Sequence, residues 1–230
     1  MRYLFIVARI LFILSLPVLL LTSNLRWAVN EVDLYTYGFD RYGVSETSGI
    51  DVGELRRVAG ELVHYFDSEE ESLNILVTRN GLESKLFSER ETVHFKDVKD
   101  LVQLDYRVQM ATLAYVLAFT LGVLLWRRRA GLRELAVSVC WGSISTLGLM
   151  ALLGIGVLIG FDRLFLGFHM TFFSNDLWMA QPGDVMAVLF PEAFFRDAAA
   201  MVAGATVAEA LLLGVGSWLV ARAKLLKNSI

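Results

Sequence analysis

Two histidines are the side chains of this sequence best suited to chemistry. An imidazole exchanges protons near neutral pH because its unperturbed pKa is about 6.5, which makes His94 and His169 candidate general acids or bases. His94 stands in the stretch ERETVHFKDVKDL, one helical turn from Glu91 and from Asp97, so a carboxylate could fix its tautomer. His169 stands in the aromatic stretch FHMTFF, where burial would favour the neutral imidazole, a competent base. Spacing alone also allows both histidines to serve only packing or a core hydrogen bond.

The sequence offers no evident protein nucleophile to accompany these histidines. The apolar stretches contain no HExxH, GxSxG or P-loop motif. The single cysteine, Cys140, lies within an apolar run, where we expect it to pack as a small hydrophobe. The third histidine, His64, stands beside Tyr65 on a predicted amphipathic helix, and we assign it a structural role.

The elements that must position the two histidines belong to a membrane protein. Apolar residues make up 56% of the chain, and most of the acidic residues fall in one segment, residues 23–107. A helix needs about 20 mostly apolar residues to cross the hydrocarbon core of a bilayer, and residues 3–21, 108–126, 135–160 and 198–221 qualify. The sequence therefore predicts an α-helical polytopic membrane protein with four transmembrane helices.

The expected layout places both termini in the cytoplasm. Lys and Arg stay on the cytoplasmic side of short loops, and they cluster at Arg127, Arg128, Arg129 and Arg133 and again at Arg222, Lys224 and Lys227. The predicted parts are a first span (1–22), an extracytoplasmic cap domain (23–107), a second span (108–126), a cytoplasmic loop (127–134), a third span (135–160), an extracytoplasmic interfacial loop (161–197), a fourth span (198–221) and a cytoplasmic tail (222–230).

The first span resembles a signal peptide in its position, but we expect it to be retained. Arg9 interrupts its apolar run, and the following LTSNLRWAVN lacks a small-x-small cleavage site. Arg9 and Glu209 are ionisable residues inside predicted spans, which makes them functional candidates or a structural ion pair between the first and fourth helices. Nothing in the charge pattern favours nucleic acid as a partner.

The cap is predicted to be a small α+β domain. The glycines Gly38, Gly43, Gly49 and Gly53 are expected to divide its first part into short elements. Residues 52–66 have the periodicity of an amphipathic helix, with Leu55, Val58, Ala59, Leu62, Val63 and Phe66 on its apolar face.

Two further signals in the cap concern a hairpin and a helix start. The run LNILVT predicts a strand that ends at a hairpin turn at Asn80 and Gly81. Ser88 followed by Glu91 fits a capping box that begins the helix carrying His94.

The second outer segment, residues 161–197, is too aromatic for an ordinary exposed loop. We expect it to lie in the membrane interface or to re-enter the membrane, because Trp and Phe favour headgroup depth. Irregular backbone around Pro182 and Gly183 is tolerated there only where protein or a wet cavity covers it.

The two histidine motifs resemble those of a known family. The strings ERETVHFKDVKDL, FHMTFF and LFPEAFF, with Asp176, Trp178 and Asp184 between the last two, are similar to the DUF1461 family of integral membrane proteins. The resemblance covers essentially the whole chain, including the opening YTYGFDRYGVSE of the cap. That family includes bacterial lipoprotein intramolecular transacylases.

The resemblance implies an activity, a substrate and a site. The reaction would move the sn-2 acyl chain of an S-diacylglyceryl lipoprotein to the α-amino group of its N-terminal cysteine, in the outer leaflet of the cytoplasmic membrane. His94 and His169 would be catalytic, and Glu91, Asp97, Asp176 and Trp178 would support them. No cofactor and no metal is expected, because the substrate amine, with a free pKa of about 7.7–8.0, is itself the nucleophile.

Two other interpretations remain open from the sequence. In the first, His94, His169 and a carboxylate such as Asp97 or Asp176 bind zinc in a metal-dependent membrane hydrolase. In the second, the chain is a non-enzymatic membrane module whose cap binds another protein. Stoichiometric zinc would favour the first, and unaltered function after substitution of both histidines would favour the second.

Overall fold

Four long helices dominate the protein. The computed structural model describes residues 2–79 and 82–226. Its helices Tyr3–Asn30, Glu89–Arg127, Ala130–Phe172 and Glu192–Ala223 are long and apolar enough to cross a membrane, and each contains one predicted span. The prediction of a four-helix membrane protein is confirmed. The predicted turn at Asn80 and Gly81, and the basic side chains of Arg128, Arg129, Lys224 and Lys227, lie outside what the structure describes.

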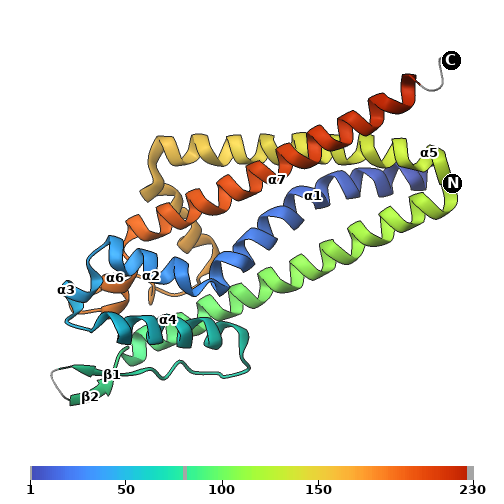
Figure 1. Cartoon of the computed structure of the whole chain (residues 1–230). Helices are drawn as coiled ribbons and strands as arrows, with labels where there is room; N and C mark the ends of the chain where they lie inside the picture. Colours follow the sequence, from blue (N-terminus) through green and yellow to red (C-terminus); the bar gives the residue numbers. More distant parts are fainter. Residues whose placement is uncertain (1, 80–81, 227–230) are drawn as a thin grey trace. The chain divides into compact units, whose positions relative to one another are not determined.

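The second and third of these helices form one uninterrupted helical run, α5 (Glu89–Phe172), which doubles back on itself in Figure 1. Gly131 permits the tight reversal. A Cβ at this position would lie 2.5 Å from the carbonyl oxygen of Val123, so a side chain there would force the two limbs apart.

The chain divides into two compact units. The first comprises Met1–Leu25, Tyr106–Leu158 and Met201–Ile230, and the second comprises Arg26–Asp105 and Ile159–Ala200. In the first unit, α1 (Arg2–Asn30), the two limbs of α5 and α7 (Glu192–Leu226) run alongside one another (Figure 1).

Small and aromatic side chains hold the helices of the first unit together. The ring of Phe12 on α1 lies 4.7 Å from that of Phe119 on α5, centroid to centroid. A Cβ on Gly142 would lie 2.7 Å from the side chain of Leu16, so the absence of a side chain lets α1 and α5 approach closely, as in other membrane helix pairs. Leu125, Leu158 and other large apolar side chains point outward, as expected of a lipid-facing surface.

The ionisable residues of the first unit do not form the ion pair considered from the sequence. The carboxylate of Glu209 accepts a hydrogen bond of 2.8 Å from the amide of Asn24, which also donates to the hydroxyl of Thr206. Among the described residues no ion pair joins Glu209 to Arg9, whose Nε is buried without a hydrogen-bond partner. A polar cluster centred on Asn24 therefore links α1 to α7.

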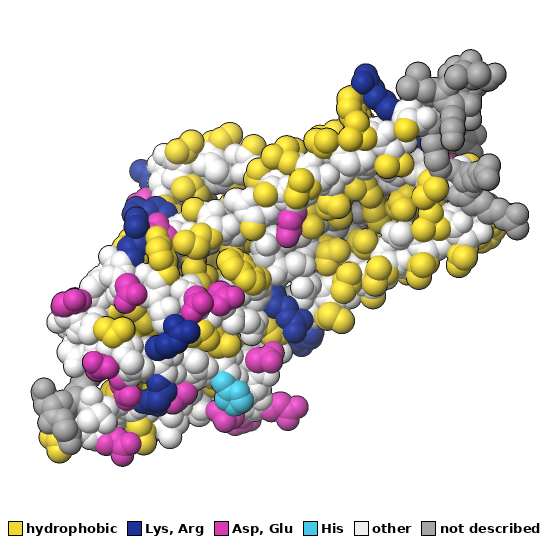
Figure 2. Space-filling model, in the orientation of Figure 1, with side chains coloured by type: hydrophobic (Ala, Val, Ile, Leu, Met, Phe, Trp, Pro, Cys, Tyr) yellow, Lys and Arg dark blue, Asp and Glu magenta, His cyan; other side chains and the backbone are white. Residues whose placement is uncertain are grey.

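The second unit joins most of the segment predicted as an α+β cap to residues 159–200, which were predicted as a separate outer loop. It contains α2 (Val32–Arg41), α3 (Val44–Ser48), α4 (Val52–Asp67), strands β1 (Leu76–Arg79) and β2 (Leu82–Lys85), and α6 (Val185–Leu189). Helix α2 packs against α4, and α3 packs against α6. On the face shown in Figure 2, apolar side chains cover the long helices, whereas acidic side chains gather over the elements of this unit.

Two details of this unit differ from the sequence prediction. On α4 the buried side includes Tyr65, whereas Val63 is only half-buried, because the buried stripe rotates slightly toward the end of the helix. Gly43 and Gly49 lie between helices in left-handed conformations, as expected of breaks, but Gly38 lies inside α2. A Cβ on Gly38 would lie 2.3 Å from the ring of Phe194, so this glycine serves close packing and not a turn.

The hairpin pairs in antiparallel register, with Leu76 opposite Lys85 and Arg79 opposite Leu82. One further backbone bond, 2.8 Å from the N–H of Leu86 to the carbonyl of Ile75, extends the pairing past the strand ends. Directly afterwards the chain turns into α5, so the hairpin leads into the helix that carries His94.

Candidate active site

His94 lies on the second turn of α5, where a capping box fixes the start of the helix. The hydroxyl of Ser88 accepts from the N–H of Glu91, and the Glu91 carboxylate accepts in return from the N–H of Ser88 at 2.8 Å. A helix whose first residue is fixed presents each later side chain in a defined direction. The His94 side chain points into the second unit and is only 5% exposed.

His169 lies on the last turn of the same helix. Helix α5 continues through Phe172, so this residue is held by regular helix, whereas the sequence suggested an irregular loop from residue 161 onward. Its Nδ1 lies 2.7 Å from the carbonyl oxygen of Phe165, one turn earlier. Because a carbonyl only accepts, Nδ1 carries the proton and the lone pair of the neutral ring is on Nε2.

The two imidazoles, distant in sequence, lie face to face. Their ring centroids are 6.4 Å apart with an angle of 28° between the ring planes. Phe173 touches both, with centroid distances of 5.1 Å to His94 and 5.4 Å to His169. Trp178 lies 4.9 Å from His169 on another side. The pair is thus enclosed by aromatic rings, and His169 is only 8% exposed.

This enclosure sets the protonation of both rings. Burial lowers the pKa of His94 to about 4, with the neighbouring His169 and Arg90 acting in the same direction and the Asp97 carboxylate opposing them. Burial also lowers the pKa of His169, opposed by the hydrogen bond to the Phe165 carbonyl. Both imidazoles are therefore neutral at pH 7 and able to accept a proton.

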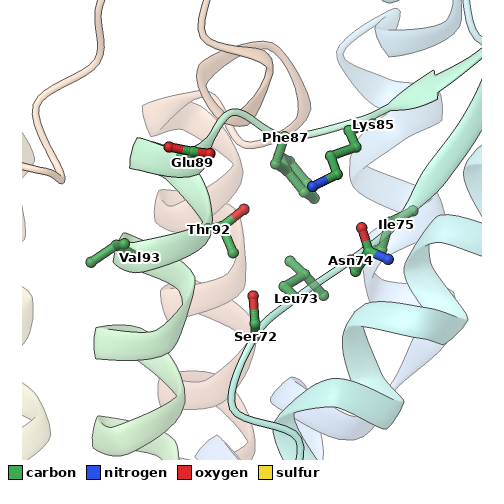
Figure 3. Close-up of a pocket in the computed structure, with 9 residues that line it drawn as sticks. All are labelled: Ser72, Leu73, Asn74, Ile75, Lys85, Phe87, Glu89, Thr92 and Val93. Carbon is green, nitrogen blue, oxygen red and sulfur yellow. The ribbon is translucent and has the colours of Figure 1, made fainter.

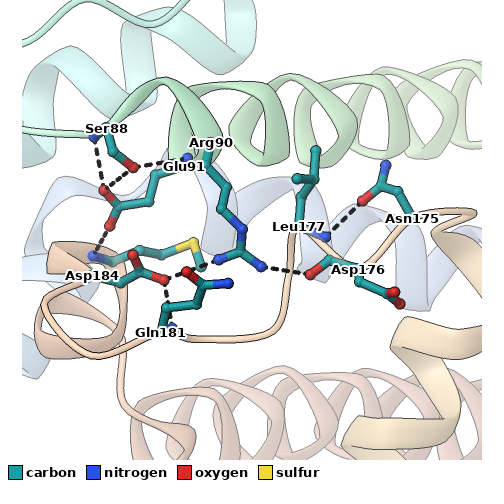
Figure 4. A network of polar contacts seen from close by, with 9 residues as sticks. Ser88, Arg90, Glu91, Asn175, Asp176, Leu177, Gln181 and Asp184 are labelled. Carbon is teal, nitrogen blue, oxygen red and sulfur yellow. Dashed lines mark hydrogen bonds and ion pairs between the residues drawn. The ribbon is translucent and has the colours of Figure 1, made fainter.

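The loop that carries Phe173 and Trp178, residues 173–184, is fastened to the start of α5 by Arg90 (Figure 4). The guanidinium donates 2.7 Å to the carbonyl of Asp176 and forms a 3.2 Å ion pair with Asp184. Asp184 also accepts from the backbone N–H of Gln181 at 2.7 Å.

Two carboxylates complete this attachment. Glu91, 2% exposed, accepts 2.7 Å from the N–H of Met186 in α6. Asp97 accepts 2.9 Å from the side-chain amide of Asn175. Arg90, Glu91 and Asp97 all lie in the short stretch 90–97 that contains His94. Together they hold the loop over His169 and the helix α6 that follows it.

The predicted supporting residues take different parts from those expected. Glu91 binds α6 and Asp97 binds the loop. Neither contacts the Nδ1 of His94, which is buried without a hydrogen-bond partner among the described residues. Asp176 contributes its backbone carbonyl, whereas its side chain is exposed. Trp178 packs on His169.

Sequence reasoning missed Arg90 and the tautomer bond to Phe165. Arg90 stands one turn before His94 on α5, a spacing that resembles an ordinary solvated helix face. A carbonyl contact to Phe165 has no side-chain signature at all. Within the described ranges, no three His, Cys, Asp or Glu residues gather closely enough to hold a metal ion, so no observed cluster matches the zinc site considered above.

These features define a polytopic membrane protein with a buried, neutral histidine pair held in a domain outside its predicted spans. Comparison with known families is specific: the profile of the lipoprotein intramolecular transacylase family matches residues 10–195. The chain belongs to this family, and it is an acyltransferase and a multi-pass membrane protein.

Solved structures agree with the fold. The lipoprotein intramolecular transacylase of Bacillus cereus matches with a TM-score of 0.76 and 19% identity, over 98% of this chain and 100% of that chain. A variant of that enzyme with a histidine replaced by arginine matches with a TM-score of 0.77 and 20% identity, over 98% and 96% of the two chains. A histidine-to-alanine variant matches with a TM-score of 0.75 and 19% identity, over 98% and 97%. No curated protein matches the sequence.

Proposed function

We propose that the protein converts diacyl lipoproteins to the lyso form and that His94 and His169 carry the proton transfers. The amine of the N-terminal cysteine attacks the sn-2 ester carbonyl of the same molecule. The new amide C–N bond forms, the ester C–O bond breaks, and the amine proton ends on the departing glycerol oxygen. The product carries an N-acyl chain and an S-monoacylglyceryl group.

The histidine pair, with rings 6.4 Å apart, is the observation that carries this proposal. A transacylation needs one group to take a proton from nitrogen and one to return a proton to oxygen, and it needs no protein nucleophile. His169 suits the first role because its Nδ1–H is held by Phe165 and its Nε2 is the free base. His94, beside it, is placed to relay the proton to the glycerol oxygen.

The enclosure of the site suits the chemistry. A neutral imidazole with a low pKa is a weak base in water, but the substrate amine loses its proton only as the C–N bond forms, when its acidity rises sharply. Aromatic rings around both histidines exclude water, which would otherwise hydrolyse the ester.

The location follows the distribution of basic residues. We propose that both termini are cytoplasmic and that the second unit faces the outer leaflet of the bacterial cytoplasmic membrane, because Arg127 and Arg133 lie in the short connection between two spans. The substrate is then a lipoprotein anchored in that leaflet.

The test is production of the lyso form in a host that makes only diacyl lipoproteins. Wild-type protein, His94→Ala, His169→Ala and the matched control His64→Ala, an exposed histidine on α4, are expressed to equal levels. N-terminal lipopeptides are then analysed by mass spectrometry. We expect N-acyl, S-monoacylglyceryl peptides from the wild type and His64→Ala, and a loss of about 10²-fold or more in the other two variants. Absence of this product with well-expressed wild-type protein would refute the proposal.

A further inference from the structure

A cavity of about 440 Å³ lies in the second unit beside the helix that carries His94 (Figure 3). One wall is the extended segment 72–75, which leads into β1. The opposite wall is the first turns of α5, with Thr92 and Val93, and Phe87 lies on the connection between β2 and α5. We call this cavity the hairpin groove. None of the contacts described for the histidine pair lies in it.

The backbone along one wall of the hairpin groove lacks partners. Hairpin pairing ends where Ile75 accepts from Leu86, because the chain then departs into the capping box of α5. Among the described residues, Ser72, Leu73 and Asn74 form no hydrogen bond with one another or with any other group. The groove occupies the position that the next residues of a pairing strand would take.

The unpaired segment keeps the geometry of a strand. Burial alternates along it, with Leu73, Ile75 and Val77 buried and Asn74 and Leu76 exposed. In an antiparallel ladder the N–H and C=O of alternate residues face the same neighbour. Since the carbonyl of Ile75 faces Leu86, the N–H and C=O of Leu73 face the groove, ready for an added strand.

The side chains around the groove suit a peptide more than a lipid. Lys85 and Glu89 both line it, and the charged group of neither is paired with another described residue. Ser72, Asn74 and Thr92 add further polar groups. An acyl chain would leave all of these groups desolvated and unpaired, whereas peptide amides could pair with them.

The groove also lies close in sequence to His94. Val93 lines it and is the immediate neighbour of His94. A helix with its side chains is about 10–12 Å across, and an extended residue covers about 3.3 Å. Three or four residues after a cysteine reacting at His94 would therefore carry the chain around α5 to the groove.

We propose that the hairpin groove binds the polypeptide that follows the lipidated cysteine, as a strand added to segment 72–75. The inference rests on the proposed function and extends it, since it identifies where the protein part of the substrate is recognised. Strand addition uses backbone groups, so binding tolerates many sequences, as an enzyme acting on many lipoproteins requires. It excludes proline at a pairing position, because proline lacks the N–H.

The test uses purified full-length protein in detergent and two synthetic diacyl lipopeptides. The short one ends two residues after the cysteine, before the groove, and the long one continues for ten residues. Thr92→Trp fills the groove, because the side chain of Thr92 points from α5 toward segment 72–75 in Figure 3, and Thr78→Trp places the same side chain on an exposed residue of β1 outside it. The rate at which the lyso form appears, followed by mass spectrometry, gives kcat/KM for each combination of protein and lipopeptide.

We expect Thr92→Trp to lower kcat/KM for the long lipopeptide by about tenfold, which corresponds to ~1.4 kcal/mol, with the short lipopeptide unaffected. Thr78→Trp should have the wild-type kcat/KM for both lipopeptides. A single proline is also placed in turn at each of residues four to seven of the long lipopeptide. We expect kcat/KM to fall at every second position, where the N–H would pair with segment 72–75. Equal effects of Thr92→Trp on both lipopeptides, or no proline effect, would overturn the groove proposal. Failure of the wild type to convert either lipopeptide would instead refute the proposed function.

Discussion

Glu91 gives the sharpest test of how the site is held together, because one buried carboxylate joins two separate segments. Its Oε2 accepts from the N–H and hydroxyl of Ser88, both at 2.8 Å, and its Oε1 accepts from the N–H of Met186 at 2.7 Å. Glu91→Ala removes both acceptor oxygens and with them all three hydrogen bonds. We expect the start of α5 to fray and α6 to detach from it.

The expected loss of stability is the sum of two costs, one at Ser88 and one at Met186. Loss of a helix-capping interaction costs about 0.5–2 kcal/mol. Leaving the N–H of Met186 without a partner costs a further ~1–3 kcal/mol. Together they predict a loss of roughly 2–5 kcal/mol, and at about 2–4 °C per kcal/mol for a chain of this size the Tm should fall by roughly 5–15 °C. Glu91→Gln keeps one acceptor oxygen, so its Tm should lie between those of the wild type and Glu91→Ala.

The assay is thermal unfolding of the purified protein in detergent. Tryptophan fluorescence is a suitable probe, since Trp178 lies in the loop of residues 173–184 that is fastened beside Glu91. Glu89→Ala is the matched control: it removes a carboxylate from the first turn of the same helix, where the side chain is exposed, and should cost no more than ~1 kcal/mol. Equal Tm values for Glu91→Ala and Glu89→Ala would refute the reasoning.

Three further predictions concern other contacts of the second unit. Gly38→Ala should destabilise by about 1–3 kcal/mol in thermal unfolding, because its methyl group would lie 2.3 Å from the ring of Phe194; a stabilised variant would mean that helix propensity outweighs the clash. The pKa of His94 falls from 6.5 to about 4 on folding, so the unfolded chain binds the extra proton between these values. The stabilising effect of the neutral ring is complete above pH 6.5 and is lost as pH falls toward 4, by up to ~3 kcal/mol, and His94→Asn should flatten this slope. Arg90→Ala and Asp184→Ala should be non-additive, with a coupling of about 0.5–3 kcal/mol in a double-mutant cycle; additive losses would show that their ion pair does not fasten the loop.

The features predicted correctly from sequence are those with local causes. The capping box of Ser88 and Glu91 depends on four consecutive residues, and it formed as expected. The four spans depend only on continuous apolar length. The amphipathic side of α4 was also largely correct, because burial there follows helical periodicity.

The site needed information that no local pattern contains. The two histidines could be selected by residue type, but their 6.4 Å approach depends on α5 leaving the second unit and returning to it. The contacts of Arg90 with Asp176 and Asp184 join segments far apart in sequence, and one of them uses a backbone carbonyl. The two carboxylates nearest His94 in sequence are bonded elsewhere, Glu91 to Met186 in α6 and Asp97 to Asn175 in the loop.

The hydrogen bond between Asn24 and Glu209 has a consequence for how the protein is made. Its two residues are 185 positions apart, on the first and the last of the long helices. During synthesis Asn24 is made long before its acceptor, and Glu209 is an ionisable residue that hydrocarbon disfavours. Insertion of α7 is more favourable when α1 is already in the membrane, because Asn24 can then donate its hydrogen bond to Glu209. A chain that loses either helix therefore leaves a polar side chain in the membrane without the partner it has in the complete protein.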